Sequence, residues 1–133
     1  MKKVKASMTV EMAYIMPIVL LVFLLVIYAV FYCHDKNILI GAAGETAVLG
    51  AQQERKKEEA GQTDLSAFGR ERAGGKMILF SGVEVSVSKS GDRIEVSMNA
   101  RRGRMQISVV QRAQIPRPEK KIRQKRKLET LAK

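Results

Sequence analysis

The chain has 133 residues and a formal net charge of +11, with one cysteine, one histidine and no tryptophan. A single cysteine excludes an internal disulfide framework and any metal site built from several cysteines. No Ser/His/Asp, metal-ligand or phosphate-loop spacing accompanies the only histidine, His34, so we expect a protein that is not an enzyme, needs no cofactor and has no small-molecule substrate.

An uncharged run fills residues 12–33 and begins directly after Glu11. It is longer than the roughly 20 apolar residues that cross a hydrocarbon core of about 30 Å as a helix. It is also too long for a signal peptide and ends without a small-x-small cleavage site, so we expect a transmembrane helix that stays in the mature protein. Lys2, Lys3 and Lys5 precede it, which favours a cytoplasmic N-terminus and places residues 34–133 outside.

Two residues mark the outer end of this run. Cys33 is interpreted as a buried small apolar residue, with a disulfide to a neighbouring subunit or a lipid modification as the alternatives. His34 is interpreted as a side chain at the membrane surface rather than as a catalytic group.

Helix-compatible sequence continues beyond the run to about residue 59, without a proline. Ala43, Ala47 and Ala51 recur at every fourth position, as close helix packing prefers. Glycines at positions 41, 44 and 50 weaken this helix, and neighbours packed closely against them would explain their presence. The pattern predicts a stalk that lies half in the membrane and half outside it.

A turn and a short helix follow the stalk. Thr63 or Asp64 is predicted to cap a helix over residues 65–72, and Gly74 and Gly75 are predicted to stop it. Residues 76–80 are apolar and fit either a strand or a helix.

Alternating apolar and polar residues then predict strands over 83–88, 93–100 and 105–109. The segments 89–92 and 101–104 are predicted turns, so the three strands form a meander with one apolar face. A sheet of this size needs a surface to lie against, most simply the outer half of the stalk. The predicted fold class is α+β: a long N-terminal transmembrane helix continuing into an external amphipathic helix, a small three-stranded antiparallel β-meander and a basic tail.

Prolines at positions 116 and 118 end the sheet. The segment that follows is either a solvated, partly helical tail or a basic helix docked on a membrane or a partner. Residues 101–133 hold 12 basic and two acidic side chains, an excess that suits lipid head groups, cell-wall polymer, nucleic acid or an acidic protein. The residues expected to contact such a polyanion are Arg101, Arg102, Arg104, Lys120, Lys121, Arg123, Lys125, Arg126 and Lys127.

The run KASMTVEMAYIMPIVLL at residues 5–21 resembles the N-terminus of TadE-like proteins, the minor pseudopilins of the Tad (tight adherence, Flp-type) pilus apparatus. These belong to the type IV pilin superfamily. The resemblance implies a basic leader that a prepilin-type leader peptidase cuts between Ala6 and Ser7 on the cytoplasmic face. It makes Glu11 the fifth residue of the mature chain, and Pro17 also resembles the family pattern.

A physical role for Glu11 follows if the cut is made. Cleavage creates a new ammonium at Ser7, and a carboxylate in a low-dielectric helix bundle finds its best partner in such an amine on a neighbouring helix. The alternative is a carboxylate that merely sits at the interface near the positive end of the helix. Pro17 either bends or locally unwinds the span, or is a tolerated membrane proline.

These interpretations divide the chain into a basic leader (1–6), a pilin-like transmembrane helix (7–33), its external continuation (34–60), a small α+β head (61–115) and a basic tail (116–133). The first functional hypothesis is a single-pass pseudopilin of the bacterial cytoplasmic membrane, with its C-terminal domain outside, at the cell surface or in a pilus. Its partners would be other pilins or pseudopilins and pilus-assembly platform proteins. The alternative is a membrane-anchored module whose basic tail contacts polyanions.

Overall fold

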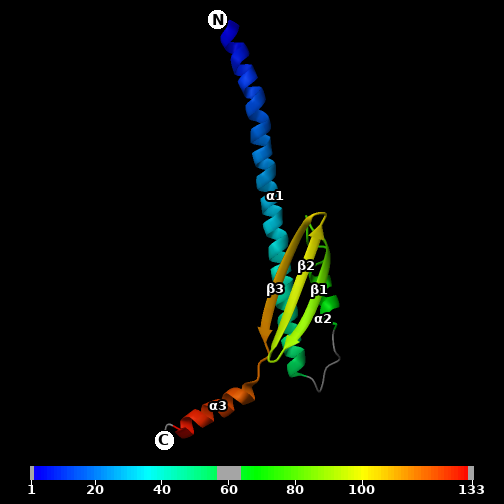
Figure 1. Cartoon of the computed structure of the whole chain (residues 1–133), viewed down its shortest axis with the longest axis vertical. Coiled ribbons are helices and arrows are strands. Elements are labelled where there is room, and N and C mark those ends of the chain that lie inside the picture. Colours follow the sequence, from blue (N-terminus) through cyan, green and yellow to red (C-terminus); the bar gives the residue numbers. More distant parts are fainter. Residues whose placement is uncertain (1, 57–63, 132–133) are drawn as a thin grey trace.

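One helix, α1 (Lys2–Arg55), forms both the predicted span and the predicted stalk. The computed structural model describes residues 2–56 and 64–131, with side chains from Met8 onward. At 1.5 Å per residue α1 is about 80 Å long, and Figure 1 shows it extending far beyond the rest of the molecule. The predicted end of the stalk after Lys56, and Thr63 with it, lie outside the described residues.

The second helix, α2 (Leu65–Ala73), begins and ends as its sequence predicts. Asp64 is its N-cap: the carboxylate accepts hydrogen bonds from the backbone N–H groups of Ser66 at 3.0 Å and Ala67 at 3.3 Å. At the other end, the N–H of Gly74 donates to the carbonyl of Arg70 at 2.8 Å. These bonds satisfy groups that a helix of this length leaves open at its ends.

The three predicted strands form one antiparallel sheet in the order β1-β2-β3. Each strand is longer than its predicted segment: β1 is Ser81–Ser90, β2 is Arg93–Arg102 and β3 is Met105–Gln114. Both turns have two residues and start with a glycine, Gly91 with φ 58° and Gly103 with φ 57°. A positive φ at the first turn position suits the right-handed twist of a hairpin and favours glycine.

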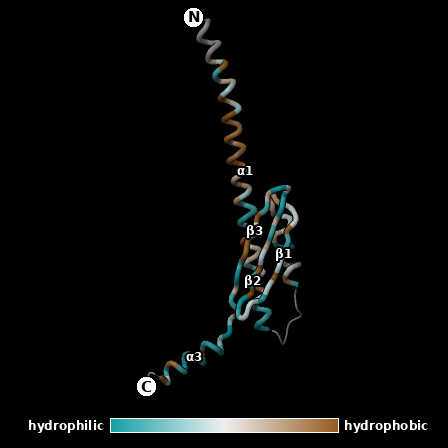
Figure 2. Tube along the Cα trace, viewed as in Figure 1, coloured by the Kyte–Doolittle hydropathy of each residue, from teal (hydrophilic) through white to brown (hydrophobic). Residues whose placement is uncertain are grey.

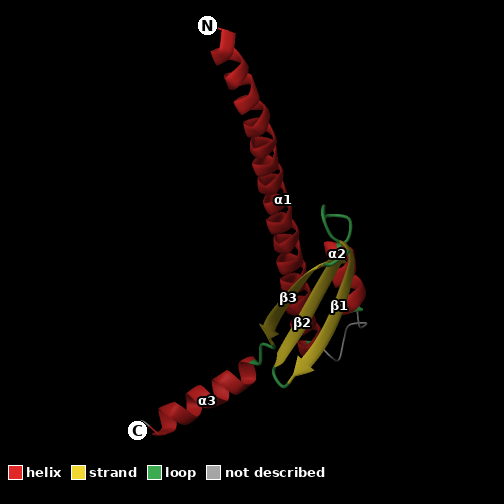
Figure 3. Ribbon diagram, turned by 45° about the horizontal axis from the view of Figure 1, so that its top comes forward, coloured by secondary structure: helices red, strands yellow, loops and turns green. Residues whose placement is uncertain are grey.

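The apolar face of the sheet lies on the outer half of α1, as expected. Figure 3 shows the strands beside this part of the helix, with α2 next to β1. Val96 and Met98 of β2 are fully buried, and so are Leu39 and Ala43 of α1. Alanines on α1 let the sheet approach the helix axis closely, which explains why they recur at every fourth residue. The third helix, α3 (Pro118–Leu131), has no buried residue.

Two predictions on the stalk need correction. Close neighbours surround only one of its three glycines: a Cβ on Gly50 would lie 3.0 Å from Leu65, whereas Gly41 and Gly44 have open space around them. Cys33 is exposed rather than buried. It lies about half a helical turn away from Asp35, which faces the head, and therefore points away from the sheet.

A glycine in α2 gives a direct test of this packing. A Cβ at Gly69 would lie 2.7 Å from Cε of Met98 and 3.0 Å from Oγ1 of Thr46, whose hydroxyl donates to the carbonyl of Ala42. We expect Gly69→Ala to lower the free energy of unfolding of the full chain in detergent micelles by about 1–3 kcal/mol, measured by circular dichroism.

The matched control is Gly44→Ala, which adds the same methyl group to open helix surface. It is expected to raise the stability by up to about 1 kcal/mol, since alanine is the better helix former. Equal stabilities for the two variants would contradict the close packing of α2.

Candidate functional site

The uncharged run is exposed along nearly its whole length; near its outer end Phe31 is half-buried against the core of the head. Its most apolar window has a mean hydropathy of 2.8 and no buried residue, and Phe23 and Leu24 are each 63% exposed. Figure 2 shows that hydrophobic residues predominate in the part of α1 that projects beyond the head. A soluble protein buries such a surface, so its exposure is consistent with a membrane protein whose one apolar helix crosses the bilayer.

The residues of the predicted processing and assembly site occupy the start of the same helix. Ala6 and Ser7 lie in the helical backbone of the first turns of α1, and Glu11 is exposed one residue before the uncharged run. Pro17 lies inside α1, which is continuous through it, so the span is not locally unwound there. The site is therefore one uninterrupted helical surface with a carboxylate at its edge.

A buried carboxylate joins the other end of the span to the head. Asp35 is 0% exposed. Its Oδ1 accepts a hydrogen bond from the N–H of Ile78 at 2.8 Å, and its Oδ2 accepts from Leu79 at 2.7 Å and Phe80 at 2.9 Å. Successive backbone N–H groups that converge in this way form an anion-binding concavity. Here the anion is a side chain of the same protein.

This contact explains why residues 76–80 form neither of the predicted elements. The segment is irregular, and three of its N–H groups donate to Asp35 instead of to a strand or helix partner. Two further contacts hold it at the outer end of the span. The rings of Tyr32 and Phe80 meet edge to face with centroids 6.2 Å apart, and Nη1 of Arg102 donates to the carbonyl of Leu79 at 3.0 Å.

The predicted polyanion-contacting residues do not form one surface. Arg101, Arg102 and Arg104 lie at the turn between β2 and β3, beside the end of the span. The remaining six lie on α3, which leaves the opposite end of the sheet (Figure 1). The nine basic residues expected to contact a polyanion thus form two groups at opposite ends of the head.

The basic helix α3 is exposed on all sides. Ile122, Leu128 and Leu131 are 52%, 67% and 84% exposed, and at 100° per residue they do not share one face. Near its start, Lys120 lies 3.4 Å and Arg117 3.0 Å from the carboxylate of Asp92. The tail is thus helical, and no part of the described chain covers it, which fits both alternatives for the tail.

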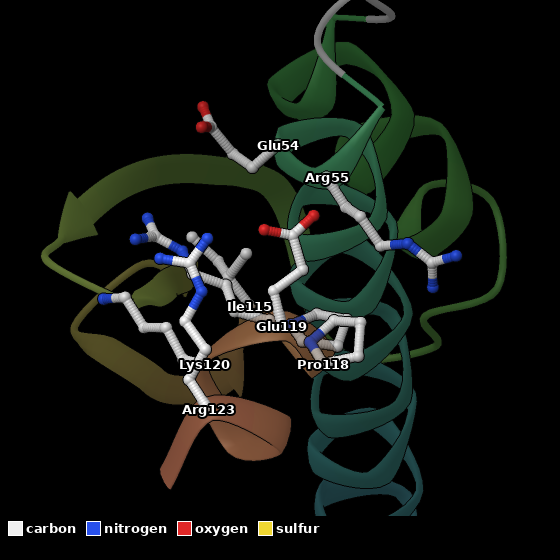
Figure 4. A pocket seen from close by; sticks show the side chains of 9 residues that line it. Glu54, Arg55, Ile115, Pro118, Glu119, Lys120 and Arg123 are labelled. Carbon is white, nitrogen blue, oxygen red and sulfur yellow. The ribbon is translucent and has the colours of Figure 1, made fainter. Parts of the chain in front are cut away.

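An open hollow of about 680 Å³ lies where α1 ends and α3 begins. Figure 4 shows that Glu54 and Glu119 share its lining with Arg55, Lys120 and Arg123. Two acidic and four basic side chains line it, so it offers no uniform field for a charged ligand. Within the part of the chain that the structure describes, no three His, Cys, Asp or Glu side chains gather where they could hold a metal ion.

The helix that carries Glu11, the uncharged run and Asp35 is also the part of the chain with a known likeness. Residues 6–48 match the family model of TadE-like proteins. This confirms the resemblance that residues 5–21 indicate, and the match covers the span and the start of the stalk. Comparison with curated proteins found no match, and neither did comparison with solved structures.

The TadE-like match covers about a third of the chain and ends within the outer half of α1. It includes Asp35 and three of the four buried alanines of α1, Ala42, Ala43 and Ala47, but none of the strands. The TadE-like segment therefore contains the span together with the start of the surface that holds the head.

The Asp35 contact was not predicted. In the sequence this aspartate is only the first acidic residue after the uncharged run, and its partners are backbone groups 43 to 45 residues away. No side-chain pattern marks a backbone N–H as a partner, so the only available signal is an acidic residue on the helix face that carries Leu39 and Ala42.

The environment of Asp35 favours its charged form. Burial by itself raises the pKa of the carboxyl, but the hydrogen bonds from Ile78, Phe80, His34 and Leu79 outweigh it, so the pKa lies below its ordinary value. A carboxyl with a lowered pKa in the folded state stabilises the fold above its unfolded pKa. That contribution is lost as the pH falls through the folded pKa.

We expect Asp35→Asn to lower the free energy of unfolding by roughly 2–4 kcal/mol at pH 7, because an amide NH₂ then faces a backbone donor that loses its acceptor. The wild type and the variant should converge as the pH falls below about 4. Thermal unfolding of the full chain in detergent, followed by circular dichroism at pH 7 and at several pH values below about 4, measures the difference in stability between the wild type and the variant. Asn37→Ala, an exposed change two residues away, is the control; a loss as large as that of Asp35→Asn would contradict the assignment.

Proposed function

We propose that this chain is a minor pseudopilin of a Tad-type pilus or secretion apparatus. It is a single-pass protein of the bacterial cytoplasmic membrane with its N-terminus inside and its head outside. The observation that carries the proposal is the exposed apolar helix, whose residues 6–48 match TadE-like proteins. Three lysines before the span, at positions 2, 3 and 5, support the orientation.

The proposed assembly step uses the start of α1. A prepilin-type leader peptidase cuts between Ala6 and Ser7, which leaves an ammonium four residues from Glu11. In the assembly, Glu11 pairs with the ammonium of a neighbouring pilin or pseudopilin helix. The attraction between two opposite charges in a low-dielectric bundle weakens strongly with distance. Such a pair therefore sets the axial register between the two helices.

The fold supports a role in which the register of the helix matters. Asp35 and the buried alanine face fix the head to α1, the same helix that forms the span. Any axial position imposed at Glu11 is therefore transmitted to the head through an unbroken helix. Platform proteins and other pilins of the apparatus are the proposed partners.

The test measures the mass of the protein extracted from membranes, in cells with an active leader peptidase and in cells with an inactive one. With the active peptidase we expect the mass of a chain that begins at Ser7. With the inactive peptidase we expect the mass of the complete chain. A chain that keeps residues 1–6 in both would contradict the proposal.

The same extracts test Glu11. Glu11→Gln should be inserted and processed like the wild type but co-purify with pilus components at least about tenfold less. Removing one member of a buried charge pair costs roughly 3–5 kcal/mol, and each 1.4 kcal/mol is tenfold in affinity. Glu84→Gln, on an exposed position of β1, is the matched control. Unchanged co-purification of Glu11→Gln would show that the charge pairing is wrong.

A second candidate function, contact with a polyanion, rests on α3. This helix is exposed, carries six lysines and arginines among its residues 120–127, and stands at the end of the head farthest from the span. Because it lies far from the membrane that α1 crosses, an anionic wall polymer fits its position better than the lipids of that membrane.

For this candidate we expect that deletion of residues 118–133 weakens binding of the detergent-solubilised chain to isolated anionic wall polymer. Binding of the complete chain should fall as salt is added, since exposed charges are screened beyond about 10 Å at 0.1 M. Deletion without effect on binding would contradict the role of α3.

A further inference from the structure

The end of the head nearest the span forms a distinct surface, which we call the membrane-facing rim. It consists of the segment before β1 and the turn between β2 and β3, with Ile78, Arg101, Arg102, Arg104 and Met105 as its members. Asp35, Tyr32 and the Arg102 contact to Leu79 hold this surface beside the outer end of the uncharged run.

The depth of the rim follows from the helix geometry. Asp35 lies two residues beyond Cys33, the last residue of the run, and each residue advances about 1.5 Å. The polar headgroup layer on each side of the hydrocarbon core is roughly 5–7 Å thick. Backbone groups bonded to Asp35 therefore lie at the level of the lipid headgroups when α1 spans the bilayer.

The exposed surface of the rim is basic, and Asp35, the carboxylate that its backbone binds, is fully buried. Residues 76–83 and 100–107 contain four basic residues and no acidic one. Arg101 donates to the side-chain amide oxygen of Gln106 at 3.3 Å. None of the three rim arginines forms an ion pair with a carboxylate of the described residues, whereas Arg72 and Arg112, elsewhere on the head, each do.

Apolar side chains accompany these charges. Ile78 is 53% exposed and Met105 is 37% exposed, although each adjoins the buried core through its neighbours Leu79 and Ile107. Exposed apolar groups beside guanidinium groups suit a bilayer interface, where the former enter the acyl boundary and the latter contact phosphate. Arginine suits phosphate because its planar fork donates two parallel hydrogen bonds.

We propose that the membrane-facing rim binds the headgroups of anionic phospholipids in the leaflet from which the head emerges. The proposal rests on the insertion of α1 in a membrane, which is part of the proposed function. The rim arginines bind lipid phosphate while Ile78 and Met105 enter the interface. Bound in this way, the head lies against the bilayer and limits the tilt of α1.

The absence of tryptophan from the chain allows single-tryptophan reporters. The full chain is reconstituted in phosphatidylcholine vesicles with and without phosphatidylglycerol. Leu24→Trp reports on the span through brominated acyl chains, and Met105→Trp reports on the rim through spin-labelled headgroups. Ser90→Trp, at the opposite end of the sheet, is the control. Ile78→Trp is a second rim reporter.

We expect quenching of Leu24→Trp in both vesicles, of Met105→Trp and Ile78→Trp chiefly with phosphatidylglycerol, and of Ser90→Trp in neither. Adding Arg101→Gln and Arg104→Gln together should lower the equilibrium constant for docking of the rim roughly 25-fold, since each surface arginine contributes about a fivefold preference for an anionic membrane. Arg123→Gln with Lys127→Gln, on α3, should leave rim quenching unchanged.

The outcomes separate the two proposals. If Leu24→Trp is not quenched, the insertion of α1 and with it the proposed function fail. If Leu24→Trp is quenched but neither rim reporter is, only the lipid contact is overturned, and an acidic protein becomes the candidate occupant. Rim quenching that is independent of phosphatidylglycerol, or equally sensitive to the α3 pair, also overturns the proposal.

Discussion

The arrangement of the head depends on the carboxylate of Asp35, which is held by three consecutive backbone N–H groups. A buried charge is tolerated only when its lone pairs are satisfied, and here the satisfying groups come from the segment that leads into β1. The contact therefore fixes where the first strand starts relative to the helix. Because β2 and β3 follow through two-residue turns, the position of the first strand determines that of the whole sheet.

The second requirement is close approach between helix and sheet. Three strands cannot bury an apolar face by themselves, and the outer half of α1 supplies the missing layer through its alanines. Gly50 and Gly69 let Ile94 and Met98 come within contact of the helix backbones. The head is consequently packed along the helix, and one core serves both.

Most of the fold could be predicted, because it depends on local patterns in the sequence. The uncharged run, the alternation in the strands, the caps of α2 and the turn glycines each depend on residues close together in the chain. The irregular segment 76–80 escaped prediction because its partner is Asp35, far away in sequence, and apolar composition suits a strand or helix equally well. Cys33 was misjudged because the side of α1 that the sheet covers cannot be known before the sheet is placed.

The candidate site was predictable to a similar degree. Glu11 and the Ala6–Ser7 junction are recognisable because they sit at the boundary of the uncharged run. The basic residues were expected to act together because they are close in sequence. However, β3 separates Arg104 from α3, and a strand of 10 residues spans about 33 Å, so the two groups lie at opposite ends of the sheet.

Gly41 and Gly44 mark a side of α1 that the sheet does not cover. The sheet covers one side of α1 only, and the open space around these glycines lies on another. Along its outer half the molecule thus has a front, occupied by the head, and a bare back. Each residue of α1 has a fixed height and a fixed angle on the helix, about 100° from the residue before it, so neighbours that pack against particular residues of the bare side fix both the height of α1 and the direction in which the head points.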